Sequence, residues 1–210
     1  MLDLDAAEIA ALGQPDIAVR DFLLIDGKAK VTGETVARGY WVGIGAVSAP
    51  VIDRRTGIQI VATFHGDGSI VSVGKIQRTA DISVRSTDVV LSQLVPAVND
   101  YLRGTDVRHV PIQIWRGYLD PATKLLVAPA KARLLGFVDE VSFATAASGG
   151  ESGVTLKCVT TTRELTRINP DVRSHESQQA RHSGDDFLAD VGTVGERQMF
   201  WGQEEGTVAS

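Results

Sequence analysis

The sequence predicts a mainly β fold, a β-sandwich or barrel with a short N-terminal helix, a short flanking helix and an irregular C-terminal arm. Three observations support this fold class. Apolar residues recur at every second position in several stretches, turn sequences rich in glycine separate these stretches, and helical signals are confined to two short segments. Many short strands joined by such turns are typical of sandwiches and barrels.

The first predicted element is a helix near the N-terminus. Asp3 or Asp5 can cap it, the alanine-rich run 6–12 continues it, and Gly13 ahead of Pro15 ends it. A second helix is expected at 96–104, because Pro96 suits the first turn and Gly104 suits the position after the last turn.

The remaining elements are predicted to be strands. The clearest alternation lies at Ile58/Ile60/Ala62/Phe64, Val110/Ile112/Ile114 and Val154/Leu156/Cys158/Thr160, where every second side chain shares one face. Further strands are expected at 17–26, 40–47, 69–74, 80–90, 124–128 and 132–143. Turn sequences fall between them at 26–27, 55–57, 65–68, 119–121 and 148–153.

The composition narrows the class of protein. The chain has 210 residues, 43% of them hydrophobic, which is enough for a real core, and its net charge of −5 argues against a general nucleic-acid binder. No apolar run reaches the length of a membrane span, and the acidic N-terminus lacks the features of a secretory signal. Cys158, the single cysteine, alternates with apolar neighbours, which predicts a core residue in a protein that folds in the reducing cytoplasm.

A change in charge and pattern divides the chain into a predicted β domain at 1–172 and a C-terminal extension or arm at 173–210. The extension carries three arginines against seven acidic residues and lacks the alternating apolar pattern. Phe187, Met199, Phe200 and Trp201 stand there in polar sequence too poor in apolar residues to form a core. These aromatic residues can dock onto a neighbouring subunit or tail protein, or fold back on their own domain.

Catalytic motifs are absent from the sequence, so neither an enzyme nor a cofactor is expected. His65 falls in a predicted turn and His109 in a predicted strand. Ser72 and Lys75 have serine–lysine spacing but lie in a strand pattern, whereas that motif needs a helix. Asp139 and Glu140 are adjacent in a strand and must point to opposite faces.

One alternative is a metal-dependent hydrolase. His175, His182, Asp185 and Asp186 are ligand types for zinc or non-haem iron. The spacing of seven positions from His175 to His182 does not match the i, i+4 pair of ligands on a helix, and the segment is rich in Ser, Gln and Arg, as a solvated surface is.

The order of features resembles a family of minor tail proteins of long-tailed bacteriophages and prophages, from the distal-tail and baseplate-hub region. The matching features run along most of the chain, from Pro15-Asp-Ile-Ala-Val-Arg20, Tyr40-Trp-Val-Gly-Ile-Gly45 and Pro111-Ile-Gln-Ile-Trp115 to Leu134-Leu-Gly-Phe-Val-Asp139 and the closing Arg173-Ser…Gln178…Gly184-Asp185…Phe187…Trp201-Gly202 pattern. The stretch 48–68 departs from this pattern by an extra turn at Asp53-Arg-Arg-Thr-Gly57.

The resemblance implies a tail-tube-like β-sandwich that assembles as a trimeric or hexameric ring at the virion tail tip, after synthesis in the cytoplasm of the bacterial host. Its expected partners are copies of itself and the tube, hub and fibre proteins of the tail. DNA passes through such a ring without specific binding. The candidate assembly contacts are Arg173, Gln178, Asp185, Phe187, Phe200 and Trp201.

A second alternative is a β-sandwich module that binds carbohydrate at a host surface. Sugar sites generally use exposed aromatic platforms, and only 6% of the residues are aromatic. Trp41, Trp115 and Trp201 are scattered along the chain.

Overall fold

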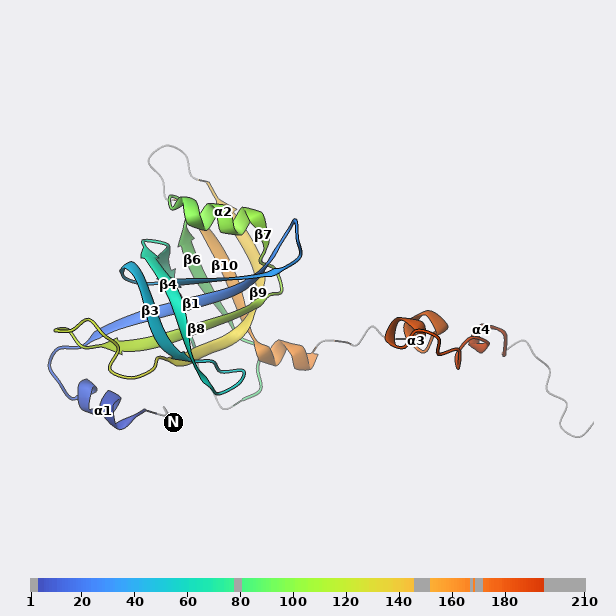
Figure 1. Cartoon of the computed structure of the whole chain (residues 1–210), viewed down its shortest axis with the longest axis horizontal. Helices are drawn as coiled ribbons and strands as arrows, with labels where there is room; N and C mark the ends of the chain where they lie inside the picture. Colours follow the sequence, from blue (N-terminus) through green and yellow to red (C-terminus); the bar gives the residue numbers. More distant parts are fainter. Residues whose placement is uncertain (1–3, 78–80, 146–151, 167, 169–171, 195–210) are drawn as a thin grey trace, which may run out of the picture. The chain divides into compact units, whose positions relative to one another are not determined.

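The computed structural model describes residues 4–77, 81–145, 152–166, 168 and 172–194. The chain divides into two compact units, Met1–Thr166 and Arg167–Ser210. The first unit is mainly β, as the sequence predicts, and the described part of the second contains short helices (Figure 1).

The strands of the first unit form one ten-stranded sheet in the order β3-β4-β2-β1-β8-β9-β10-β6-β5, with the short β7 paired to β1. Their bounds are β1 Ala18–Ala29, β2 Thr35–Trp41, β3 Ile44–Ile52, β4 Gln59–Asp67, β5 Ile70–Val73, β6 Ser86–Ser92, β7 Thr105–Asp106, β8 Pro111–Leu119, β9 Lys131–Ala144 and β10 Gly153–Thr160. The helices are α1 Ala6–Leu12, α2 Pro96–Gly104 and the 3-10 helix η1 Thr161–Thr166. All named strand pairs are antiparallel except β2 with β4, which is parallel.

One half of the sheet closes on itself. β3 lies at one end of the strand order, but it is also hydrogen-bonded to Ala130, the residue before β9. The N–H of Ile52 donates to the Ala130 carbonyl at 3.0 Å, and the N–H of Ala130 donates to the Pro50 carbonyl at 2.9 Å. The strands from β3 to β9 therefore enclose a small barrel, and the sheet continues beyond it through β10, β6 and β5.

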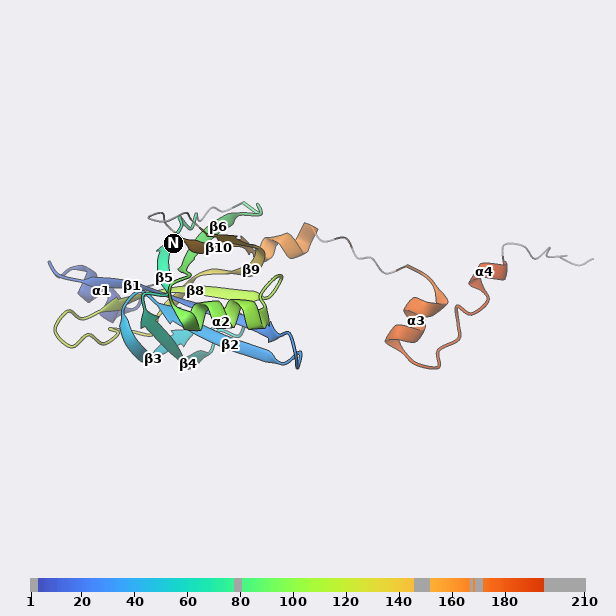
Figure 2. The ribbon, with the colours of Figure 1, turned by 90° about the horizontal axis from the view of Figure 1, so that it is seen from above.

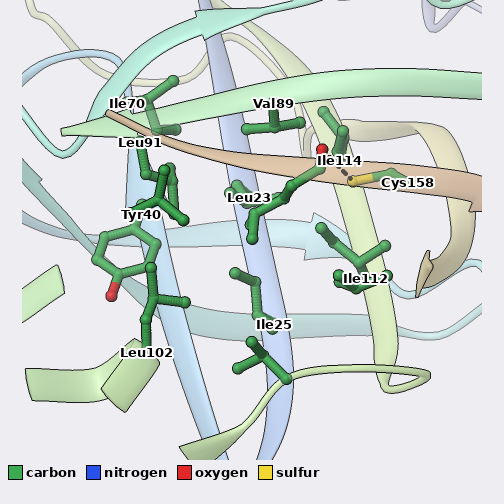
Figure 3. Packing of buried hydrophobic residues seen from close by; sticks show 14 of the residues in the cluster. Leu23, Ile25, Tyr40, Ile70, Val89, Leu91, Leu102, Ile112, Ile114 and Cys158 are labelled. Atoms are coloured by element: carbon green, nitrogen blue, oxygen red, sulfur yellow. Dashed lines mark hydrogen bonds between the residues drawn. The ribbon is translucent and has the colours of Figure 1, made fainter. Parts of the chain in front are cut away.

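The two faces of the central strands pack into two different cores. Leu23 and Ile25 of β1 belong to the larger core, where they meet strands β6, β8, β9 and β10 and helix α2. Figure 3 shows these side chains pointing toward one another, with Cys158 among them. Phe22 directly precedes Leu23 and therefore points to the opposite face of β1. It belongs to the second core, with Phe64 and Trp115. Burial on both faces of β1 thus explains the continuous apolar run from Phe22 to Ile25.

Both predicted helices are present, and each is attached to the sheet by specific contacts. In α1, the Glu8 side chain accepts a hydrogen bond from the Asp5 N–H at 2.8 Å, and its carboxylate lies 3.3 Å from the ammonium group of Lys131. Helix α2 begins at Pro96 and lies beside the sheet (Figures 1 and 2). Its Val98 and Leu102 side chains belong to the larger core. Contrary to expectation, Gly104 belongs to the helix itself, and Thr105 in extended conformation ends it.

Three predicted strands differ in the structure. The stretch 40–47 is divided between β2 and β3 by a bend at 42–43, and Gly45 has a φ of 76°, which favours glycine. The stretch 80–90 contributes a strand only from Ser86 onward. The stretch 124–128 is a turn region with Lys124 at a φ of 60°, joined to β8 by a single bridge from Leu119 to Leu126.

The two central histidines are also placed differently from the prediction. His65 lies inside β4, paired with Tyr40 and Ala46, because the tight turn begins only at Gly68, whose φ is 79°. His109 lies in the turn before β8 with a φ of 57°, and its N–H donates to the Val138 carbonyl at 2.7 Å. Cys158 is fully buried, as the sequence predicts, and burial raises the pKa of its thiol to about 12.

Candidate functional site

Four of the candidate assembly contacts, Arg173, Gln178, Asp185 and Phe187, lie in the described part of the second unit, which contains helix α3 (His175–Arg181) and the short helix α4 (Val191–Val194). Ser174 caps α3, since its hydroxyl accepts a hydrogen bond from the Ser177 N–H at 3.2 Å. The helix ends at His182, whose N–H donates to the Gln178 carbonyl at 2.9 Å. Gly184, at a φ of 89°, then reverses the chain back along the helix.

Asp185 holds this reversed segment against α3. The side-chain amide of Gln178 donates to one carboxylate oxygen of Asp185 at 2.6 Å, and the N–H of Phe187 donates to the other at 3.1 Å. These two hydrogen bonds lower the pKa of Asp185, so the carboxylate stays ionised. The structure therefore brings together three of the sequence-predicted residues, Gln178, Asp185 and Phe187.

Phe187 is presented to solvent by this arrangement. Its side chain is 86% exposed, and Ile168, Val172 and Val191 are exposed as well. None of the described side chains in this unit is buried. Apolar groups that lack a core of their own favour a surface that another protein covers.

The other predicted contact residues do not join this cluster. Arg173 is exposed and lies in the bend before α3. Phe200 and Trp201, together with Met199, lie outside the described residues.

The proposed metal ligands do not converge on one point. The closest pair is His175 with Asp186, whose Nε2 and Oδ1 atoms are 3.9 Å apart, and that same oxygen accepts a hydrogen bond from Gln179 at 2.7 Å. Both oxygens of Asp185 are occupied by amide donors. Within the described ranges no three His, Cys, Asp or Glu side chains are grouped to hold a metal ion. The metal-centre alternative has no geometric support in this part of the chain.

The described tryptophans are structural rather than a platform for sugars. Trp115 is fully buried and its indole N–H donates to the Ile52 carbonyl at 2.7 Å. Trp41 stacks on Phe22 with ring centroids 5.8 Å apart, and its N–H donates to the Gly45 carbonyl at 2.9 Å. Trp201 lies outside the described residues.

A basic groove on the first unit was not predicted. It consists of two hollows of about 370 and 430 Å³, and the side chains of Arg54 and Arg133 line both. Arg54 belongs to the turn at 53–57, and its N–H donates to the Gln113 side chain at 3.1 Å. The only sequence signal for the groove is the arginine pair in that turn, since Arg133 lies far away in the chain on β9.

Comparison with solved structures gives a distant likeness. No family model matches the chain, and no curated protein matches it. A chain in the solved structure titled "Virion of native gene transfer agent (GTA) particle" is similar to it, with 17% identity, a TM-score of 0.49, and coverage of 82% of this chain and 50% of that chain. This chain thus spans about half the length of the virion chain. A likeness this distant does not by itself define a function.

The described helices were also compared with the requirements of a membrane span. None of them is both long enough and apolar enough to cross a bilayer.

Proposed function

We propose that the chain is a structural component of the tail tip of a bacteriophage-type particle. It forms part of a distal-tail or baseplate-hub ring and links the tail tube to hub or receptor-binding proteins. The ring contains three or six copies, and the protein acts through its interfaces, which transmit the signal for tail opening, rather than through catalysis. It is synthesised in the cytoplasm of the host and becomes part of the virion.

The observation that carries this proposal is the exposed apolar surface of the second unit. Phe187 is 86% exposed although its N–H donates a hydrogen bond to the Asp185 carboxylate that holds the backbone in place, an arrangement that leaves the phenyl group in solvent. A closed ring needs a surface of this kind, because in a cyclic interface each copy offers one patch and receives a different one. The resemblance of the sequence to minor tail proteins supports the same role.

Residues 173–202 serve as the assembly arm in this proposal. Gln178 and Asp185 fix the shape of the arm, and Phe187 supplies its apolar contact. Arg173 at its start, and Phe200 and Trp201 near its end, are proposed to extend the interface along the neighbour. The acidic charge of the chain suits a ring through which DNA passes without being held, since like charges repel phosphate.

The test is the mass of the full chain in solution at high concentration, measured by light scattering after size exclusion, with negative-stain images of the peak. Closed rings of three or six copies are expected. Because a ring of this kind can require a template, the same measurement is repeated with purified tail tubes of the parent particle. A chain that stays monomeric alone and also fails to bind the tubes would contradict the proposal.

A further inference from the structure

The groove around Arg54 and Arg133 has a charge distribution that calls for an acidic occupant. Five cationic side chains line its two hollows, against three acidic ones: Arg54, Arg85, Arg116, Lys131 and Arg133 against Asp5, Glu8 and Asp81. The groove therefore carries an excess of positive charge on a chain whose net charge is −5.

Most of these cations already have acidic partners. Arg116 is bonded to Asp21 at 2.8 Å, Arg85 to Asp81 at 3.2 Å, and Lys131 lies 3.1 Å from Asp5. Arg133 is different, because its guanidinium donates to the neutral hydroxyl of Tyr118 at 3.1 Å. The Arg54 side chain makes no hydrogen bond or ion pair with any residue that the structure describes.

Arg54 and Arg133 thus border the same pair of hollows, and neither guanidinium is paired with a carboxylate of the described residues. An anionic group bound in the hollows is attracted to both, and a guanidinium fork suits a carboxylate. The hollows also have an apolar component, since Ile52, Ala132, Leu134 and Leu135 contribute to the lining. An occupant that combines an apolar side chain with carboxylates fits both features.

The segment Asp186–Asp190 of the arm has this combination. Its Phe187 is 86% exposed, and the two aspartates flank the exposed apolar part. Asp186 uses one carboxylate oxygen to accept a hydrogen bond from Gln179 at 2.7 Å, which leaves its other oxygen for a partner. Asp190 is exposed, and its backbone carbonyl, not its carboxylate, accepts the hydrogen bond from Thr193 at 3.0 Å.

We propose that the Arg54–Arg133 groove of one copy binds the Asp186–Asp190 segment of a second copy. Phe187 occupies an apolar part of the hollows, and the carboxylates of Asp186 and Asp190 lie against the two guanidinium groups. This inference rests on the proposed function, because it takes a second copy as the neighbour. Charge complementarity supports that choice, since residues 173–210 carry seven acidic residues against three arginines.

The test uses sedimentation of the full chain at about 50 mM salt, where ion pairs of this kind are only partly screened. One variant reverses the groove, with Arg54→Glu and Arg133→Glu, and another reverses the segment, with Asp186→Arg and Asp190→Arg. Each reversal is expected to weaken self-association on the order of tenfold or more, because it places like charges together. Mixing the two variants is expected to restore association, since each then offers the partner charge that the other needs.

The matched control is Arg20→Glu with Arg108→Glu, which changes the net charge by the same amount at exposed positions outside the groove. It is expected to leave association close to that of the unchanged chain. If this control weakens association as much as the groove reversal does, the loss of association is caused by the change in net charge and not by the groove, and the inference is overturned.

Three other outcomes would also overturn it. An unchanged chain that stays monomeric both alone and in the presence of purified tail tubes rules out a second copy as the occupant. If a single chain carrying all four substitutions sediments as a compact monomer, like the unchanged chain, and does not associate, the arm binds the groove of its own chain. Rings that persist in both reversal variants mean that the groove is not the docking site, while the proposed ring function itself stands.

Discussion

The hydroxyl of Tyr101 accepts a hydrogen bond from the backbone N–H of Gly27 at 2.9 Å, which ties helix α2 to strand β1. The same oxygen lies 2.9 Å from the carbonyl of Ile25 and 2.9 Å from that of Val36 on β2, so its proton is donated there. Gly27 is required for this contact, because a Cβ at that position would lie 2.6 Å from the hydroxyl. Burial raises the pKa of Tyr101 to about 12, which keeps the donor protonated.

Replacing Tyr101→Phe is expected to destabilise the first unit by about 1–3 kcal/mol, because the buried Gly27 N–H loses its acceptor. Urea unfolding followed by circular dichroism measures the free energy. The matched control is Tyr40→Phe on β2. Tyr40 is also fully buried and lies beside the Arg38 side chain, but its hydroxyl accepts no hydrogen bond from a buried backbone N–H, so the cost there is expected to be smaller. Equal costs for both variants would contradict the role given to the hydroxyl.

Gly136→Ala is expected to destabilise the sheet by about 1–3 kcal/mol, since overpacking forces the backbone to move. A Cβ at Gly136 of β9 would lie 1.9 Å from the Val159 carbonyl oxygen of β10, and a backbone atom cannot turn aside as a side chain can. Gly104→Ala serves as the control in thermal unfolding. No atom lies within 4 Å of a Cβ there, so this helical position is expected to gain slightly from alanine. A Gly136→Ala protein as stable as the unchanged chain would show that β9 and β10 can move apart enough to accommodate the methyl group without loss of stability.

The thiol of Cys158 is expected to make stability fall at alkaline pH. Its pKa is raised to about 12 by burial first and by the charge of Asp88 second, against 9.0 for an exposed thiol. The folded state therefore holds this proton more tightly than the unfolded state does. The contribution is fully present below pH 9 and is lost as the pH rises through 9 toward 12. Between pH 8 and pH 10 the loss from this group is on the order of 1 kcal/mol.

Cys158→Ala isolates this effect from that of the other groups that titrate in the same range. The variant is less stable at pH 8, because a buried side chain is removed, but its free energy of unfolding is expected to decline less between pH 8 and pH 10. Parallel pH profiles for the two proteins would show that the thiol does not titrate differently on folding.

Truncation after Asn169 is expected to leave a folded first unit that no longer assembles. The described part of the second unit contributes no buried side chain, so its removal takes little from the core of the first unit. Circular dichroism checks the fold, and light scattering checks assembly. Phe187→Ala in the full chain is a milder version, expected to weaken assembly without affecting thermal stability. Loss of the β-type spectrum on truncation would instead assign the arm to the core.

Strands that bury one or both faces were predictable from the sequence. The alternation at 110–114 and 154–160 reports directly on residues such as Ile112, Ile114, Leu156 and Cys158, all of which are fully buried. The division of 40–47 was not predictable, because it depends on tertiary packing. The Trp41 ring lies over Gly43, where a Cβ would be 2.1 Å from the ring. The alternation of apolar residues in this stretch does not indicate that contact.

The candidate site was predictable to a smaller extent. Phe187 lies in a segment too poor in apolar residues to form a core, and the sequence left open whether its side chain docks on a neighbour or folds back on its own domain. The structure shows the side chain 86% exposed. The contact of Gln178 with Asp185 depends on the reversal at Gly184, and the groove depends on a turn meeting β9. Such pairings of distant segments leave no periodic signal, so only the three-dimensional structure reveals them.

The alternation of β1 between two cores has a consequence for how the first unit comes apart. Phe22 and Leu23 are consecutive residues, yet each belongs to a different apolar cluster. A slip of β1 by one residue would move every side chain to the wrong cluster. The contacts on both faces of β1 therefore specify the same strand register. Because the two clusters share this backbone, loss of one is expected to destabilise the other. We therefore expect the barrel and the extended part of the sheet to unfold in a common transition.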